Sequence, residues 1–294
     1  MRLGAAALWA PLLLGTAAAC GDDASGGGPD GAVDGGGATG PITLGGEERP
    51  ARLVLPADAP RPLPLVVLLH GYSVSATLQD AYFRTSQPAR RDGFALLLPD
   101  GTFDDSENRF WHALPGFGGM VSDVDDVGYL LGIIDEAIAE HGVDPARVYL
   151  LGHSNGAFMA YRIACEAADR IAGMASLAGS SYPDATACPP SRGVPVLQIH
   201  GDADDRIPYE GTAEYPGALA IAERWAGIDG CEPTPVAAGT LDFDSGIDGA
   251  ETEMQAWPGC DTGLDVQLWT IRGGAHLPAV SDEGIDAVLA WLVR

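Results

Sequence analysis

Basic side chains are scarce in this chain. Its 294 residues include 16 arginine and lysine residues against 41 aspartate and glutamate residues, so the formal net charge is −25. A protein that binds nucleic acid must neutralise backbone phosphates with basic side chains, and this charge balance excludes a general role of that kind. The excess of acid instead predicts a highly soluble surface, rather than a site for one basic partner.

Long apolar runs are also missing, except near the start of the sequence. Residues 3–19 are apolar and end in three alanines, a pattern typical of a secretory signal rather than a membrane span. Cys20 follows at once, which predicts a lipoprotein cleavage site where the thiol is acylated and the chain is tethered to a membrane. Ala17 stands where such signals usually carry a larger aliphatic residue, so simple cleavage after Ala19 is the alternative.

Apolar bulk is almost absent from the next segment. Residues 21–40 are mainly Gly, Asp, Ala and Pro, and such a composition predicts a flexible linker. We therefore expect a signal over residues 1–20, a linker over 21–40 and a single domain over 41–294. Export would place that domain on a membrane surface, in the periplasm or outside the cell.

Cysteine is sparse, and close Cys-x-x-Cys pairs are lacking. Besides Cys20 the chain has Cys165, Cys188, Cys231 and Cys260, and an even number in an exported domain predicts two disulfides. Three pairings are possible. We expect the pairing that is local in the sequence, Cys165 with Cys188 and Cys231 with Cys260. No Cys or His spacing favours a zinc site.

What the chain does contain is an alternation of two hydrophobic patterns. Continuous apolar runs are typical of strands buried on both faces of a parallel sheet, and they occupy residues 65–69, 94–98, 148–151 and 194–199. Two further strands are expected at 52–55 and 266–271. Apolar residues at helical spacing predict helices over 127–138, 213–225 and 282–292. The alternation predicts an α/β fold with a mostly parallel sheet.

Residues 230–265 show neither pattern clearly, and we expect an irregular, acidic surface excursion there. Asp242, Asp244 and Asp248 raise the question of a calcium loop. Gly246 comes one position too early for the usual loop pattern, so the sequence favours a solvated loop without a metal.

One pentapeptide has the pattern of a catalytic motif. Gly152-His153-Ser154-Asn155-Gly156 follows the apolar run 148–151 and precedes an alanine-rich apolar segment. A strand, a sharp turn carrying a serine, and a helix together make a nucleophile elbow, and glycine tolerates the tight turn. The sequence therefore predicts Ser154 as a nucleophile.

A serine hydroxyl needs a base to take its proton and an acid to orient that base. In this kind of site the chain order is serine, acid, histidine. The loop after strand 194–199 offers Asp202, Asp204 and Asp205 as the acid. His276 alone among the histidines lies beyond that loop, so chain order selects it as the base.

The reaction also needs donors for the oxyanion. One is expected from the backbone N–H of Asn155, the residue after the nucleophile, and another from an early post-strand loop. Leu69-His70-Gly71-Tyr72 fits that loop, with the N–H of Tyr72 facing the site. We interpret His70 and His153 as packing residues rather than bases. No metal or cofactor is expected.

With these motifs the chain resembles the extracellular poly(3-hydroxybutyrate) depolymerase and feruloyl/acetylxylan esterase-like group of α/β-hydrolases. The resemblance implies an α/β-hydrolase fold with helices on both faces of the sheet. In that group the acid loop reads His-Gly-x-x-Asp-x-x-Val-Pro-Tyr, which assigns the acid to Asp204 rather than to Asp202 or Asp205. Ser154 and His276 match the nucleophile and base. The motifs span about residues 50–294: Leu69 to Gly71, Asp123 to Tyr129, Asp144 to Tyr149, Gly152 to Gly156, His200 to Tyr209 and Gly273 to His276.

The resemblance also places Cys231 and Cys260 where members carry a cysteine pair. It departs after His276, where Leu277-Pro278-Ala279-Val280 replaces a Thr-Trp-Pro-Gly-like run. That change leaves the catalytic residues in place but alters the expected wall for an acyl group or polymer.

The resemblance implies a serine esterase that forms an acyl-enzyme. Its ester substrate would be a hydroxyalkanoate polyester, a feruloylated or acetylated polysaccharide, or a smaller molecule. One alternative is a serine peptidase, disfavoured because the chain leaves no room for a large accessory domain. The other is a non-catalytic surface binding protein on the same scaffold. The oligomeric state is not indicated.

Overall fold

A single sheet of 10 strands organises the described part of the molecule, residues 42–114 and 123–293 of a computed structural model. The strand order is β1-β2-β4-β3-β7-β8-β9-β12-β11-β10, and β5 and β6 form a separate hairpin. The strands are β1 (Ile42–Leu44), β2 (Ala51–Val54), β3 (Leu63–Leu69), β4 (Ala95–Leu98), β5 (Thr102–Phe103), β6 (Arg109–Phe110), β7 (Val143–His153), β8 (Gly173–Leu177), β9 (Val196–Gly201), β10 (Val236–Leu241), β11 (Thr252–Trp257) and β12 (Val266–Ile271).

The middle of the sheet is parallel and its edges are antiparallel. From β4 through β3, β7, β8 and β9 to β12 every neighbouring pair is parallel. At each end two antiparallel pairs are added, so the sheet is mixed but mostly parallel. Central strand β3 shows why the apolar runs are continuous. Its Val67 packs in the core on one face of the sheet and its neighbour Val66 in the core on the other.

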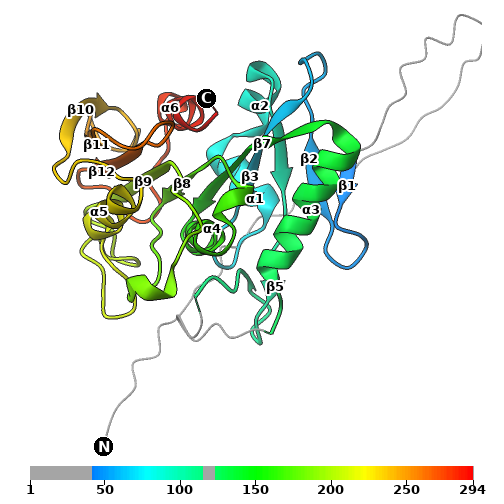
Figure 1. Cartoon of the computed structure of the whole chain (residues 1–294), viewed down its shortest axis with the longest axis horizontal. Coiled ribbons are helices and arrows are strands. Elements are labelled where there is room, and N and C mark those ends of the chain that lie inside the picture. The colour runs from blue at the N-terminus through cyan, green and yellow to red at the C-terminus, as the bar shows by residue number, and fades with distance from the viewer. Residues whose placement is uncertain (1–41, 115–122, 294) are drawn as a thin grey trace, which may run out of the picture. The chain divides into compact units, whose positions relative to one another are not determined.

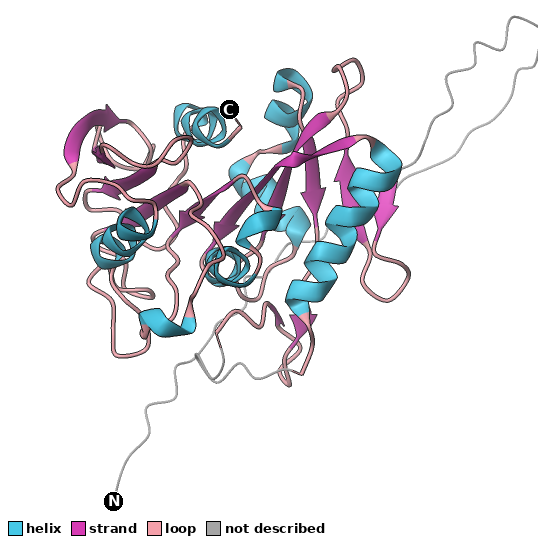
Figure 2. Cartoon of the chain, in the orientation of Figure 1, coloured by secondary structure: helices cyan, strands magenta, loops and turns pink. Residues whose placement is uncertain are grey.

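Helices cover both faces of this sheet. The cores assign α3, α4 and α5 to one face and α1, α2 and α6 to the other. Figure 1 shows α4 and α5 below the sheet and α2 and α6 above it, and Figure 2 shows the strands as a continuous twisted layer between them. The helices are α1 (Ala76–Phe83), α2 (Ser86–Asp92), α3 (Asp126–His141), α4 (Asn155–Glu166), α5 (Ala218–Ile228) and α6 (Asp282–Leu292), with short turns η2 (Ala168–Arg170) and η3 (Ala185–Ala187).

The fold class is the expected α/β arrangement, but the segment 230–265 is not an irregular excursion. It forms β10 and β11, which pair antiparallel with each other and extend the sheet beyond β12. Most of β10 is exposed, as its place at the sheet edge requires, so it lacks the apolar pattern of a buried strand. Asp244 is also not a solvated loop residue. It is buried, and its carboxylate accepts hydrogen bonds from the backbone N–H groups of Gly246 and Ala279, each at 2.9 Å.

The helix expected over residues 213–225 begins later, at Ala218. Pro216 makes an isolated bridge with Gly211, and Gly217 caps the helix in an extended conformation. A Cβ on Gly217 would lie 2.6 Å from the carbonyl carbon of Glu210, so the approach of two backbones sets the start of the helix. Strand β8 was not expected at all, because Gly-Met-Ala-Ser-Leu is not a clear apolar run, although it lies buried between β7 and β9.

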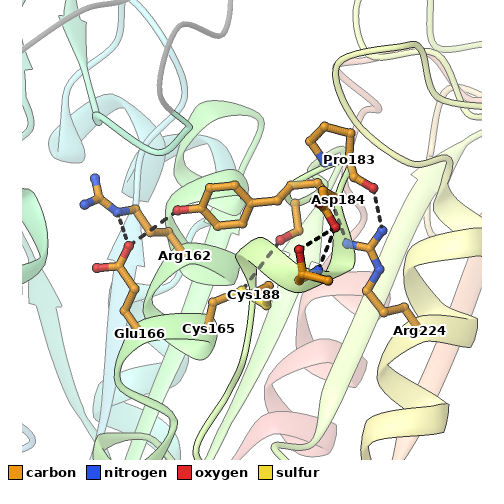
Figure 3. Close-up of a disulfide and its surroundings, with 10 residues drawn as sticks. Arg162, Cys165, Glu166, Pro183, Asp184, Cys188 and Arg224 are labelled. Atoms are coloured by element: carbon orange, nitrogen blue, oxygen red, sulfur yellow. Dashed lines mark hydrogen bonds and ion pairs between the residues drawn. A yellow bond between two sulfur atoms is a disulfide. The ribbon is translucent and has the colours of Figure 1, made fainter.

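The structure joins Cys165 to Cys188 and Cys231 to Cys260, the pairing expected from the sequence. The first disulfide links α4 to the segment after β8 (Figure 3). That segment is also held by Arg224 of α5, whose guanidinium donates to the carbonyl of Pro183 at 3.2 Å. Two disulfides fit a protein that folds outside the reducing cytoplasm.

The expected signal over residues 1–20, with Cys20, and most of the expected linker lie outside the described residues. Within the described ranges, no helix has both the length and the apolar character needed to cross a membrane.

Candidate active site

Three polar side chains from distant parts of the sequence meet beyond the carboxyl ends of the parallel strands. Ser154 lies between β7 and α4, Asp204 follows β9, and His276 follows β12. His276 Nε2 is 2.9 Å from Ser154 Oγ, and its Nδ1 is 2.8 Å from Asp204 Oδ2. The structure therefore brings together the three residues expected from the motifs. The carboxyl edge of a parallel sheet is where open α/β folds bind ligands.

The turn at Ser154 has the strained backbone expected of an elbow between a strand and a helix. Its φ is 53° and its ψ −123°, a conformation rare for residues other than glycine. The backbone N–H of Ser154 is held by the carbonyl of Leu177 at the end of β8, at 2.9 Å. A Cβ on Gly152 would lie 2.5 Å from the carbonyl oxygen of Gly156, so the elbow has no space for a side chain there.

Asp204 is buried and surrounded by donors. Its Oδ1 accepts from the backbone N–H groups of Arg206 at 2.8 Å and Ile207 at 2.9 Å, and its Oδ2 accepts from His276. Burial alone would raise the pKa of Asp204. Hydrogen bonds from His200, His276 and the Ile207 backbone outweigh that effect, and the pKa lies well below its usual range. Asp204 is therefore an anion that can orient an imidazole.

A second, buried histidine supports Asp204 from β9. His200 Nε2 donates to the carbonyl of Ile207 at 2.7 Å and lies 3.4 Å from Asp204 Oδ2. Gln198 donates its amide to His200 Nδ1 at 3.1 Å, which places the proton of His200 on Nε2. Tyr161 of α4 in turn donates to the Gln198 oxygen at 2.8 Å. This series of hydrogen bonds fixes the tautomer of His200, so that its protonated Nε2 faces Asp204.

The other two candidate aspartates are separated from the imidazole. Asp202 accepts a hydrogen bond from the N–H of Gly273 at 2.6 Å and pairs with Arg272 at 3.2 Å, so it ties the acid loop to the histidine loop. Asp205 is exposed. Because a Cβ on Gly201 would collide with the carbonyl of Gly274, these two loops also touch through their backbones.

The loop after β3 lies against the elbow. A Cβ on Gly71 would be 3.5 Å from Ser154 Cβ, so this glycine allows the loop to approach Ser154. The N–H groups of Tyr72 and Asn155, the two expected oxyanion donors, have no acceptor among the described residues. The Tyr72 hydroxyl points elsewhere and donates to Asp104 at 2.5 Å.

His70 and His153 are buried and act on the backbone of the site. His70 donates from Nδ1 to the carbonyl of Gly71 at 2.7 Å and accepts at Nε2 from the N–H of Gly101 at 2.8 Å. His153 donates from Nε2 to the carbonyl of His276 at 3.1 Å. Desolvation lowers the pKa of His70, and desolvation with nearby His276 lowers the pKa of His153 to about 4. Both are neutral at pH 7.

Several supporting residues had no recognisable signal in the sequence. Trp111, Gln198 and Gln79 contact the site through individual side-chain or backbone hydrogen bonds, and no spacing pattern marks such contacts. His200 stood in the acid-loop motif, but its contact with Asp204 was not expected. Across the described ranges no group of His, Cys, Asp and Glu residues is arranged to hold a metal ion.

Comparison with known proteins places this chain among esterases. The family model for esterase PHB depolymerases matches residues 51–205. NocK of Nocardia uniformis subsp. tsuyamanensis, named as an esterase, is 31% identical over 80% of this chain and 72% of its own length. Feruloyl esterase B of Piromyces equi is 28% identical over 76% of this chain, but that match covers only 41% of the Piromyces protein.

Among solved structures, an acetyl xylan esterase from Aspergillus awamori aligns with a TM-score of 0.63 over 86% of this chain and 98% of that one. Its sequence identity is 15%, so this likeness concerns the fold. The family match extends from β2 through the elbow to the acid loop, and it covers more than half of the chain. The chain belongs to the esterase PHB depolymerase family of ester hydrolases and has the α/β-hydrolase fold.

Proposed function

We propose that Ser154 is the nucleophile of this ester hydrolase, His276 its general base and acid, and Asp204 the residue that orients His276. Ser154 Oγ attacks the ester carbonyl carbon while His276 Nε2 takes the hydroxyl proton. The tetrahedral oxyanion is held by the N–H groups of Tyr72 and Asn155. Collapse breaks the bond to the alcohol, which receives the proton from His276 and leaves an acyl-enzyme.

Water completes the cycle by the same route. His276 takes a proton from water, the resulting hydroxyl attacks the acyl carbon, and Ser154 leaves with the proton from His276. The observation that carries this assignment is the continuous hydrogen-bond chain from Ser154 Oγ through His276 to Asp204. No step requires a metal or a cofactor.

A fluorophosphonate probe tests the assignment, because it bonds covalently to an activated serine. We expect it to label Ser154, identified by peptide mass spectrometry, and to abolish hydrolysis of p-nitrophenyl acetate in proportion to labelling. Ser154→Ala should lose labelling and activity while its thermal unfolding resembles that of the unmodified protein. A folded protein that is neither labelled nor active would support the non-catalytic binding protein, and hydrolysis of peptide amides in preference to esters would support the peptidase.

We propose that the natural substrate is a carboxylic ester within a polymer, either an acylated polysaccharide or a hydroxyalkanoate polyester. The family name and the name of the Piromyces relative support these two chemistries. Rates on methyl ferulate, acetylated xylan and polyhydroxybutyrate, measured against short p-nitrophenyl esters, separate them. If the short esters exceed every polymer in kcat/KM by orders of magnitude, the polymer assignment is wrong.

We also propose that the protein is exported and tethered through an acylated Cys20. The apolar run 3–19 and the small residues before Cys20 support this, and both disulfides are compatible with export. Expression of Cys20→Ala in a bacterial host should move the enzyme from the membrane fraction to the soluble exported fraction. An unchanged membrane fraction would overturn the tether.

A further inference from the structure

Four backbone polar groups of the short loop after β3, residues 70–73, are hydrogen-bonded to neighbouring groups. The carbonyl of His70 accepts from the Trp111 indole Nε1 at 3.0 Å, and the carbonyl of Gly71 accepts from the His70 ring. The N–H of Gly71 donates to the Gln79 side chain at 3.0 Å, and the N–H of Ser73 donates to the carbonyl of Arg109 at 2.8 Å. The N–H of Tyr72 lies between these fixed groups and remains available to a ligand.

Two of those contacts come from one short segment, Arg109 to Trp111, formed by strand β6 and the residue after it. Arg109 holds Ser73 through its carbonyl, and Trp111 holds His70 through its indole. Trp111 is fully buried, and its ring lies 5.0 Å from the His70 ring between centroids. The segment therefore fixes the loop on both sides of Tyr72.

The same segment is clamped to the nucleophile elbow. The Asn155 side chain is buried, and its Oδ1 accepts from the backbone N–H of Trp111 at 2.6 Å. Its Nδ2 donates to the Trp111 carbonyl at 2.9 Å. Both polar atoms of the Asn155 amide are thus hydrogen-bonded to the backbone of Trp111. Asn155 is also the residue whose backbone N–H faces the oxyanion in the proposed mechanism.

We infer that Trp111, held by the Asn155 side chain, is a positioning residue that fixes the two oxyanion donors relative to each other. This inference rests on the proposed function. The two donors belong to different segments, because the N–H of Asn155 starts α4 and the N–H of Tyr72 follows β3. Close backbone packing of Gly156 against Leu69 and His70 holds these segments together, and hydrogen bonds through Trp111 add to that packing. Trp111 connects them through two hydrogen-bonded contacts, one to each side.

The physical reason for such a brace is the precision that the reaction needs. Oxyanion donors stabilise charge only where they lie within about 2.7–3.1 Å of the developing oxygen, and removing one donor costs about 10²–10³ in kcat. A brace that places both donors before the substrate arrives avoids reorganisation during the reaction. Its loss should weaken binding of the transition state and leave binding of the ground-state ester nearly unchanged.

Trp111→Phe is the direct test, because it removes the indole donor and retains an aromatic ring beside His70. Trp225→Phe is the matched control. Trp225 is equally buried, lies in α5, and its indole nitrogen has no hydrogen-bond partner among the described residues.

Activities on p-nitrophenyl acetate are normalised to the sites titrated by fluorophosphonate, so unfolded protein does not contribute. We expect Trp111→Phe to lower kcat about tenfold with KM changed less than about twofold. The Trp225→Phe control should have the kcat and KM of the unmodified enzyme.

Two further measurements distinguish positioning from a general structural role. Butylboronic acid forms a tetrahedral adduct on an active serine, and its inhibition constant should rise in Trp111→Phe by the same factor as kcat/KM falls. Asn155→Leu removes the clamp from the other side. The double variant with Trp111→Phe should lose little more than the worse single variant, because both changes break one connection.

The inference is overturned if Trp111→Phe keeps the kcat of the Trp225→Phe control. It is also overturned if the variant changes KM alone, or if boronate inhibition does not follow kcat/KM. Fully additive losses in the double variant would show that Trp111 and Asn155 act separately. An unmodified enzyme that neither labels nor hydrolyses esters would instead refute the proposed function on which the inference rests.

Discussion

Asp204 keeps a negative charge inside the protein because donors reach both of its oxygens. The backbone N–H groups of Arg206 and Ile207 hold one oxygen, and His276 and His200 lie at the other. Its depressed pKa means that the charge stabilises the fold above the usual aspartate range. That contribution is lost only when the pH falls toward the depressed value.

Asp204→Asn tests the orienting role at the scale of one atom. An amide at this position would present N–H toward His276 Nδ1, so the imidazole would adopt the wrong tautomer for accepting the Ser154 proton. We expect kcat for ester hydrolysis to fall by about 10⁴, with KM changed only slightly. Asp205→Asn in the same loop is the control and should keep its activity. A similar kcat loss in both variants would contradict the assignment of the acid to Asp204.

At Asp229, in contrast to Asp204, the effect of burial on the pKa outweighs that of hydrogen bonding. Asp229 is buried at the end of α5, where desolvation raises its pKa to about 7 despite a hydrogen bond from the Val194 N–H at 3.1 Å. Asp261 adds to the rise and Arg192 opposes it. The folded protein therefore holds a proton that the unfolded chain releases near the ordinary pKa of 3.8. Stability falls as the pH rises from that value to about 7 and then levels off.

Asp229→Asn should remove this pH dependence, because an amide cannot ionise and its oxygen can still accept from Val194. We expect the urea midpoint of the variant, relative to the unmodified protein, to rise more at pH 8 than at pH 5. The comparison at two pH values separates the charge effect from any change in packing. An equal difference at both pH values would show that Asp229 does not carry a raised pKa.

At the scale of elements, the connection from β7 to α4 depends on backbones approaching closely. A Cβ on Gly156 would collide with the carbonyl oxygen of Leu69 and lie 2.6 Å from that of His70. The first turn of α4 thus packs directly on the end of β3. Neither backbone can move away without moving Ser154 or the loop that carries Tyr72.

Gly156→Ala should therefore destabilise the protein by about 1–3 kcal/mol, the usual cost of overpacking, and should lower kcat. Gly132→Ala in α3 is a matched control. Gly132 is an exposed position inside the helix, and a Cβ there meets nothing within 4 Å, so we expect a gain of up to about 1 kcal/mol from helix propensity. Urea unfolding measures both changes. Equal effects in the two variants would contradict the close approach at Gly156.

At the scale of the whole molecule, the disulfides tie segments that the sheet holds only loosely. Cys165 and Cys188 are 23 positions apart in sequence, and Cys231 and Cys260 are 29 apart. The second pair closes the segment that leaves α5, forms edge strand β10 and its neighbour β11, and returns toward β12. An edge strand pairs on one side only, so a covalent link at the base of this hairpin adds to the part of the sheet with the fewest strand contacts.

Replacing either pair with serines should lower the free energy of unfolding by about 3–4 kcal/mol, the loop-closure value for loops of this length. The Cys165–Cys188 pair is buried and the Cys231–Cys260 pair is partly exposed. Dithiothreitol should therefore reduce Cys231–Cys260 first, which mass spectrometry after thiol alkylation would detect. Reduction of the buried pair first would contradict this order.

Much of the fold followed from patterns that act locally. Strand β12 and helix α6 have the predicted limits, because a continuous apolar run and an amphipathic pattern each reflect the environment of consecutive residues. Chain order and local motifs were also enough to nominate Ser154 and His276, whereas the choice of Asp204 over Asp202 and Asp205 came from the resemblance to the esterase group. Patterns failed for β8, β10 and β11, where small or exposed residues adopt strands because neighbouring strands supply the hydrogen bonds.

The sequence by itself determined the class of fold, the elbow with its serine and the order of its partners. Each of these depends on residue type and spacing along the chain. Only the tertiary structure decided that Asp202 ties two loops while Asp204 faces the imidazole, and that Trp111 connects Tyr72 to Asn155. Such contacts join segments far apart in sequence through a few hydrogen bonds. No periodicity encodes them, since they exist only once the sheet has brought its strand ends together.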